Sequence, residues 1–215
     1  MTRPGIHTAS EDRSLPVPFT PARASAIYTM RTLETAAERD EAAALVQDRQ
    51  NWLVLHSLPA PAGADIPAQF RTAQTRSAGL FEDGRMLACL IPEQSPDLAW
   101  GQGPCLFLRS LYTLPGHPDD VTRLITLWAS DFAARHDLPH VRAEAPTRQL
   151  RDPAPVAQLL NRLIDMGWDL YGPGCGQAGE VARLELKAEH RSGLGALINC
   201  RVQVPQPAQR DRSTA

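Results

Sequence analysis

Charged side chains cluster at one junction of the chain, in the segment LYTLPGHPDDVTRLI from Leu111 to Ile125. The segment is typical of a strand that ends at a proline, a sharp turn at Gly116 and the start of a long helix. Free backbone N–H groups and the positive end of the dipole make a helix N-terminus a ready site for a phosphate. Arg123, one turn into the helix, could offset a phosphate charge.

Two adjacent carboxylates, Asp119 and Asp120, oppose this chemistry. At an effective dielectric near 20, unit charges about 7 Å apart repel by about 2 kcal/mol. The helix dipole usually contributes less than about 1 kcal/mol. Both carboxylates would therefore weaken phosphate binding if they faced the phosphate. The simpler interpretation is that one of them caps the helix and satisfies a backbone N–H that a phosphate would otherwise use.

Alternating strands and helices must position this junction. In the helix that follows it, Val121, Leu124, Ile125, Trp128 and Phe132 recur at three- and four-residue spacing, which predicts a helix packed on a sheet. Other apolar patterns predict further elements. We expect strands over 27–33, 105–115, 139–145 and 180–189, a hairpin over 78–94 that turns at Asp83-Gly84, helices over 35–55 and 155–168, and a glycine-rich connection over 171–179.

The composition is that of one globular domain. A chain of 215 residues suits one domain, which we expect over 27–189, between disordered tails at 1–26 and 190–215. A net charge of −2 disfavours nucleic-acid and anionic-membrane partners. No apolar run is long enough to span a membrane, and the N-terminus lacks a signal pattern. Four cysteines without a C-x-x-C pair favour the cytoplasm.

Three motifs stand out along this order of elements. They are LYTLP (Leu111 to Pro115), LITLWASDFAARHDLPHVRAE (Leu124 to Glu144) and LLNRLIDMGW (Leu159 to Trp168). Together they resemble the GNAT superfamily of acyl-CoA-dependent N-acyltransferases. The resemblance implies an α/β (α+β) fold, with a mixed, mostly antiparallel sheet of about six or seven strands flanked by helices. It also implies acetyl-CoA as co-substrate and an amine of a small molecule or a protein as acceptor.

The resemblance also implies where acetyl-CoA binds. The pantetheine arm would lie along the backbone of the central strand, with the pyrophosphate on the next helix N-terminus. The corresponding residues of this chain are Leu111, Thr113, Gly116, His117, Val121, Thr122 and Arg123. The family's phosphate loop usually reads as Arg or Gln, two residues, then Gly-x-Gly. Here the loop is about two residues short and keeps only Gly116.

Two residues are candidates for catalysis. Glu144, near the end of a predicted strand, could act as the general base that takes a proton from the attacking ammonium. Many family members carry a tyrosine acid near the end of the last helix, where this chain has Leu163. Tyr171 is the alternative acid. Each also has a plain structural interpretation, Glu144 as a solvent-facing carboxylate and Tyr171 as an aromatic at the edge of the core.

Two other interpretations follow from the same residues. His136 and His140 have a spacing that could hold a metal on one helix, but Pro139 separates them, so we expect no metal site. The altered phosphate loop leaves a second functional hypothesis, a degenerate GNAT-like protein that binds a ligand or partner without catalysis. An edge strand could also pair across a homodimer.

Overall fold

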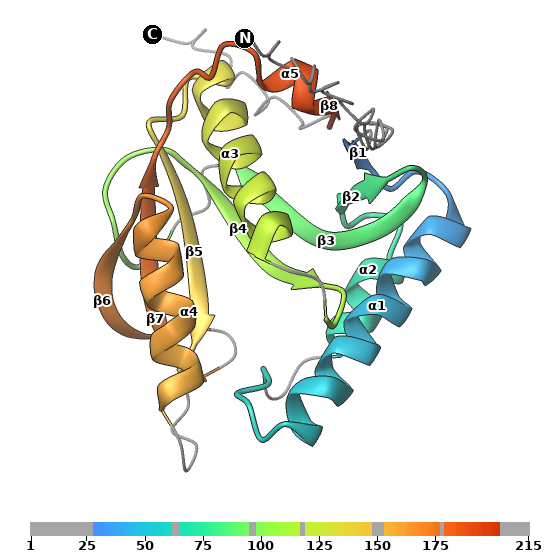
Figure 1. The fold of residues 1–215 in the computed structure, drawn as a ribbon, viewed down its shortest axis with the longest axis horizontal. Helices are drawn as coiled ribbons and strands as arrows, with labels where there is room; N and C mark the ends of the chain where they lie inside the picture. Colours follow the sequence, from blue (N-terminus) through green and yellow to red (C-terminus); the bar gives the residue numbers. More distant parts are fainter. Residues whose placement is uncertain are drawn as a thin grey trace, which may run out of the picture.

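The computed structural model of the chain describes residues 28–61, 65–94, 98–116, 119–147, 153–176 and 179–202. Within these residues the strands form one sheet in the order β6-β7-β5-β4-β3-β2-β1-β8 (Figure 1). The strands are β1 (Tyr28–Thr32), β2 (Ala78–Glu82), β3 (Arg85–Gln94), β4 (Cys105–Thr113), β5 (His140–Pro146), β6 (Trp168–Gly176), β7 (Gly179–Lys187) and β8 (Ile198–Arg201). The helices are α1 (Ala36–Leu55), α2 (Ile66–Arg71), α3 (Asp119–Arg135), α4 (Ala154–Asp165) and α5 (Leu194–Leu197).

The sheet is mixed and mostly antiparallel, as the sequence predicted. Only β4 with β5 and β1 with β8 run parallel, and the other neighbours are antiparallel. None of the helices in the described ranges is long and apolar enough to cross a membrane. The outer strands are β6 and β8. The predicted pairing of an edge strand across a homodimer stays a prediction.

Helices cover the two faces of the sheet and bury two separate cores. On one face, α3 contributes Leu124, Ile125 and Trp128 to a core that continues through Val141 of β5 and Leu184 of β7. The opposite face carries a second core between α1, α2 and the strands β2 to β4. Figure 1 shows α1 on the side of β2 and β3, and α4 on the side of β6 and β7. Over β5 and β7, by contrast, the face opposite α3 carries the charged side chains of Arg142, Glu144, Arg183 and Glu185.

The C-terminal boundary of the predicted domain is wrong. Residues 194–201, which the sequence analysis assigned to a disordered tail, form α5 and β8. Strand β8 runs parallel to β1, with Ile198 opposite Tyr28, and it adds an eighth strand to the predicted six or seven. Three contacts hold this segment in place: pairing with β1, the burial of Ile198 and a hydrogen bond from Trp128 Nε1 to Cys200 Sγ (3.3 Å). Its own sequence pattern is too short to predict a strand.

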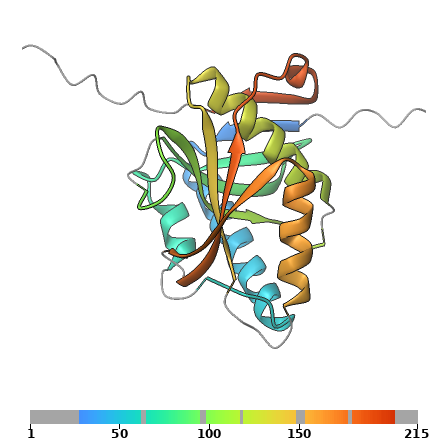
Figure 2. The same ribbon diagram turned by 90° about the vertical axis from the view of Figure 1, so that its left-hand side faces the viewer.

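A second correction concerns the glycine-rich connection. Helix α4 ends at Asp165 rather than at Trp168, and Trp168 begins β6. Most of the stretch predicted as a connection therefore belongs to a strand that pairs with β7 through Gly176. Hydrogen bonds to β7 stabilise a strand that its glycines alone would disfavour. Figure 2 shows that this hairpin is strongly coiled and that β6 runs away from α4 along its length.

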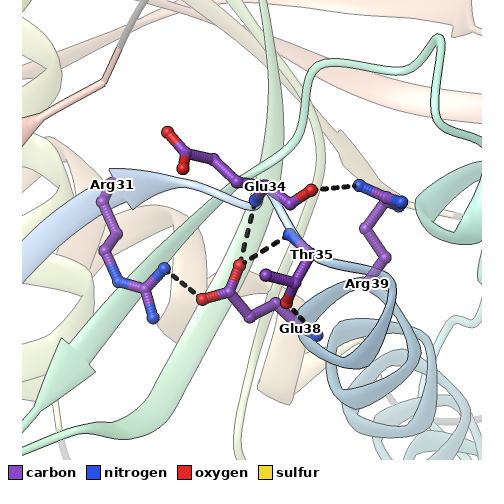
Figure 3. A network of polar contacts seen from close by, with 5 residues as sticks. All are labelled: Arg31, Glu34, Thr35, Glu38 and Arg39. Atoms are coloured by element: carbon purple, nitrogen blue, oxygen red, sulfur yellow. Dashed lines mark hydrogen bonds and ion pairs between the residues drawn. The ribbon is translucent and has the colours of Figure 1, made fainter.

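The start of α1 is fixed by a network of polar contacts (Figure 3). Thr35 Oγ1 accepts the Glu38 backbone N–H at 3.2 Å, and the Glu38 carboxylate accepts the Thr35 backbone N–H at 3.0 Å. This reciprocal pair is a capping box, which satisfies two of the N–H groups that a helix start leaves free. Arg31 of β1 also donates to Glu38. The network joins the first strand to the first helix.

Candidate active site

The two central parallel strands part halfway along their length. Strand β4 pairs with β5 only from Cys105 opposite His140 to Leu108 opposite Ala143. Beyond these residues β4 stays bonded to β3, and β5 stays bonded to β7. Figure 1 shows β4 and β5 diverging toward their C-terminal ends. The facing backbone of β4 after Leu108 therefore lacks a strand partner and can bind an extended ligand.

A bulge in β4 lies at the point where the strands part. Cys89 and Ile91 of β3 are two residues apart, but their partners Tyr112 and Arg109 are three apart, so β4 carries one extra residue. Ser110 takes it up with a φ of 53°. The bulge reverses which side chains face α3: Leu108 lies in the α3 core, whereas Tyr112 lies in the α1 core. Burial raises the pKa of Tyr112 to about 12, so its hydroxyl stays neutral.

The residues predicted to hold acetyl-CoA follow this bulge. Leu111 is 37% exposed, and Thr113 is half-buried. Gly116 has a φ of 77°, and open space surrounds the place where a Cβ would stand. His117 lies outside the described residues. A backbone of this shape, without a side chain, allows close approach of a ligand.

In the first turn of α3, the predicted residues differ in direction. Val121 is 4% exposed and packs into the α3 core, so only its backbone can contact a ligand. Thr122 is half-buried and Arg123 is exposed. The side chain of Asp119 lies outside the described part, and that of Asp120 is exposed.

Negative charge gathers at this end of the sheet. A hydrogen bond to Glu82 is the largest cause that raises the pKa of the Tyr28 hydroxyl, and burial adds to it. The charges of Glu82, Asp120 and Asp83 raise the pKa further. Three carboxylates therefore stand within electrostatic reach of Tyr28, and one of them, Asp120, lies in the first turn of α3.

Glu144 is fixed on the opposite face of the sheet from α3. It lies on β5 one residue beyond Ala143, the last residue paired with β4. Trp100, in the β3–β4 connection, donates its indole N–H to Glu144 Oε1 at 3.0 Å. The other carboxylate oxygen lies against Gly176 of β6, where an added Cβ would come within 2.2 Å of it. One carboxylate is therefore oriented at the point where the strands part.

Two arginines flank the Trp100 ring, and only one of them is paired. The buried Arg142 donates to Glu185 Oε2 (2.7 Å) and to the carbonyls of Gly103 (3.2 Å) and Gln102. Arg183 lies 5.5 Å from the Trp100 ring centroid. It makes no hydrogen bond or ion pair within the described residues, although its Nε is buried. A buried donor without a partner costs about 1–3 kcal/mol, so Arg183 is held there at a cost.

Tyr171, on β6, also lies beside Trp100. Its ring centroid lies 5.5 Å from that of Trp100, and the side chain is 54% exposed. Glu144, Tyr171 and Arg183 thus meet around one tryptophan, and we call these four residues the Trp100 cluster. No group of His, Cys, Asp and Glu side chains in the described residues could hold a metal ion. His136 and His140 do not form such a group.

Comparison with known proteins places the fold. No protein-family model matches the chain, and no curated protein matches its sequence. Among solved structures, a GNAT-family acetyltransferase from Streptococcus agalactiae 2603 matches with a TM-score of 0.56 and 11% identity, over 75% of this chain and 96% of that one. The ribosomal-protein-S18-alanine N-acetyltransferase from Escherichia coli matches with a TM-score of 0.51 and 14% identity, over 78% and 97%. The NatC complex bound to Gag peptide and CoA matches with a TM-score of 0.51 and 10% identity, over 75% and 98%.

The chain has the GNAT fold. The resemblance stated from the sequence is therefore confirmed at the level of the fold. Of the residues predicted for the site, Glu144 and Tyr171 come together around Trp100, while Leu111, Thr113 and Gly116 lie along β4 and its turn.

Sequence reasoning missed Trp100 and Arg183. Trp100 lies in a short Gly-containing connection that carries no periodic pattern. Arg183 did carry a signal, because it stands on the polar side of an alternating strand, opposite Glu144 in the register of β5 and β7. Only the fold shows that these two residues meet.

Proposed function

We propose that this protein is an N-acetyltransferase that moves an acetyl group from acetyl-CoA to an amine of a small molecule or a protein. The observation that carries the proposal is the parting of β4 and β5, with Glu144 fixed at the point of parting. Neighbours with the same fold include N-acetyltransferases and one structure with CoA bound. All four cysteines are free thiols, which suits a reducing cytoplasm.

The chain offers backbone and side chains to hold acetyl-CoA. The unpaired edge of β4 beyond Leu108 would hydrogen-bond the amides of the pantetheine arm. The turn at Gly116 and the first turn of α3 would hold the pyrophosphate, through the backbone N–H groups of Val121 and Thr122 and the guanidinium of Arg123. Leu111 and Thr113 would line the arm.

Acetyl-CoA supplies an activated thioester. The amine attacks its carbonyl carbon, the C–N bond forms, and the C–S bond breaks to release the thiolate of CoA. Before this attack, Glu144 takes one proton from the ammonium, directly or through one water, and so frees the lone pair of the amine. The nitrogen loses its second proton to solvent as the amide forms. Tyr171 gives its proton to the leaving thiolate and regains one from solvent.

A thermal-shift titration tests the first requirement of this function. Acetyl-CoA at a hundredfold excess over its Kd should stabilise the fold by about 2.7 kcal/mol. Adenosine and 3′,5′-ADP serve as controls that lack the pantetheine arm. If millimolar acetyl-CoA leaves the melting temperature unchanged, the protein is not an acetyltransferase.

The acidic end of the sheet favours a second candidate function. Asp120 lies in the first turn of α3, where the pyrophosphate would lie, its charge acts on Tyr28 together with those of Glu82 and Asp83, and Leu163 replaces the usual tyrosine. These features suit a non-catalytic GNAT-like protein that binds a ligand or a partner. Positioning alone can nevertheless sustain transfer in a site that lacks an identifiable acid. Release of free CoA thiol in the presence of an amine acceptor separates the two functions.

A further inference from the structure

We infer that the acceptor of this protein carries a free carboxylate beside its amine, as an amino acid does, and that Arg183 binds this carboxylate. The inference rests on the proposed function, because it assigns a substrate class to the same site. Its starting point is the difference between the two arginines at Trp100.

Arg142 is a structural arginine. Its side chain is 3% exposed, and Glu185 and two backbone carbonyls occupy its N–H groups. It ties the β3–β4 connection to β5. Each of its three nitrogens thus donates to a protein acceptor, and the side chain is buried away from a ligand.

Arg183 differs from Arg142, because it makes no hydrogen bond or ion pair in the described part of the chain. It is partly exposed, and its register partner across the strands is Glu144, yet the two side chains do not form an ion pair. The Glu144 carboxylate instead accepts the indole N–H of Trp100 and lies on Gly176. The Arg183 guanidinium has five N–H donors, stands in register with a carboxylate and makes no hydrogen bond in the described residues, so its forked donors are free to bind a carboxylate.

The side chains of Arg183 and Glu144 lie against glycine backbone of β6. An added Cβ at Gly174 would come within 2.3 Å of Arg183 Nε, and one at Gly176 would come within 2.2 Å of Glu144 Oε2. The two glycines of β6 therefore allow both side chains to lie flat against the hairpin. Trp100, 5.5 Å from the Arg183 guanidinium carbon, supports the planar group from another side.

The neighbouring positions of Glu144 and Arg183 indicate which chemical class of acceptor fits the site. Directly opposed residues of an antiparallel pair have their Cβ atoms about 4.5–5.5 Å apart. Glu144 and Arg183 start from such opposed positions, and their ends lie over Gly176 and Gly174, two residues apart on β6, so a proton acceptor for an amine and a forked donor for a carboxylate are neighbours. An α-amino acid presents its amine and its carboxylate at this close spacing. A peptide N-terminus does not, since its first carboxylate has become an amide.

Direct binding tests the inference without any acetyl transfer. The twenty standard L-amino acids and their carboxamides are each titrated into the full-length protein, with melting temperature as the readout and calorimetry on the best ligand. At least one amino acid should stabilise the protein, and its carboxamide should bind at least about tenfold more weakly, because a charge-assisted pair is lost. Equal binding of acid and carboxamide would overturn the inference, and so would the absence of any stabilising amino acid.

Three variants assign the effect to Arg183. Arg183→Gln should weaken amino-acid binding at least about tenfold and leave carboxamide binding unchanged. Arg183→Lys keeps the charge but loses the fork, so it should recover part of the affinity. Lys187→Gln removes a positive charge from the same strand, at a side chain that is 79% exposed, and should bind like the wild type. If Arg183→Gln and Lys187→Gln behave alike, Arg183 is not the carboxylate site.

The outcomes also separate this inference from the proposed function. Amino-acid binding that depends on Arg183, in a protein that does not bind acetyl-CoA, would overturn the transferase and keep the carboxylate site. Acetylation of simple amines as fast as of the matching amino acids would keep the transferase and overturn the carboxylate site.

Discussion

Glu144 receives its orientation from a residue far away in the sequence. Trp100 donates one hydrogen bond to it, and the second carboxylate oxygen rests on the backbone of Gly176. An oriented carboxylate at the point where β4 and β5 part is what a general base needs, because proton transfer depends first on geometry. A half-buried side chain held by these contacts does not fit the alternative of a solvent-facing carboxylate.

Glu144→Gln therefore tests the role of the carboxylate. Glutamine keeps the shape and still accepts the Trp100 N–H, but it cannot accept a proton, so kcat should fall by about 10²–10⁴-fold. Release of free CoA thiol with the preferred acceptor measures this. Glu189→Gln, at a side chain that is 50% exposed, is the matched control. A kcat within twofold of the wild type would remove Glu144 from the mechanism.

At the scale of single residues, the sequence predicts which residue types could do chemistry better than it predicts which residues contact one another. Glu144 and Tyr171 were predicted as catalytic candidates because carboxylates and phenols at element ends can move protons. Trp100 and Arg183 were not predicted, because their meeting depends on a connection and a curled hairpin that lie far apart in the sequence. No local pattern encodes such a contact.

Among the elements, α3 begins with a conflict between helix stability and ligand binding. An aspartate in the first turn favours the helix dipole by about 0.3–1 kcal/mol. The same charge repels a pyrophosphate by about 2 kcal/mol if the two lie about 7 Å apart at an effective dielectric near 20. The exposed Asp120 would thus stabilise the helix and weaken the binding of the pyrophosphate.

Asp120→Asn should consequently have two effects of opposite sign. The free energy of unfolding should fall by less than about 1 kcal/mol, and the Kd for acetyl-CoA should decrease severalfold. Urea unfolding and calorimetry measure the two quantities. Asp165→Asn, at the end of α4, is a control for loss of one negative charge. Unchanged affinity in Asp120→Asn would show that its carboxylate points away from the pyrophosphate.

The capping box of α1 makes the stability of the fold depend on pH. Burial alone would raise the pKa of Glu38, but hydrogen bonds from the Thr35 and Glu34 backbone and from Arg31 outweigh it and lower the pKa from 4.5 to about 2. A carboxyl with a lower pKa in the folded state stabilises the fold above its unfolded pKa. This contribution is lost as the pH falls from about 4.5 toward about 2.

Glu38→Gln should remove that part of the acid sensitivity. The variant should be less stable than the wild type at pH 6, and the difference should shrink at pH 3. Urea unfolding at the two pH values measures it. Glu41→Gln, at an exposed position of the same helix, should leave the pH dependence unchanged. A stability difference of equal size at both pH values would contradict the assignment to the Glu38 carboxylate.

Elements with a strong period were predictable, and those stabilised by their neighbours were not. The spacing in α3 and the Asp83-Gly84 turn predicted a helix and a hairpin that the structure contains. The helix prediction for 155–168 ran three residues too far, because the apolar Met166 and Trp168 continue its pattern while Gly167, at a φ of 96°, ends the helix. Strand β6 depends on β7, which no local pattern in 171–179 encodes.

Strand β8 forms one edge of the sheet, next to β1. Ile198 is 2% exposed and belongs to the α3 core, so Ile198→Ala should lower the free energy of unfolding by about 2–5 kcal/mol. Asn199→Ala, at the exposed neighbouring position, should change it by less than about 0.5 kcal/mol. Chemical denaturation measures both. Equal effects of the two substitutions would show that β8 contributes no core packing.

The pairing of β1 with β8 also sets an order of events during synthesis. Residues 28–32 leave the ribosome long before residues 198–201, yet only the later segment covers the outer edge of the earlier one. Until then β1 presents unpaired N–H and C=O groups, the kind of edge that recruits foreign strands. A nascent chain of this protein therefore exposes this strand edge to other chains until its C-terminal segment has emerged.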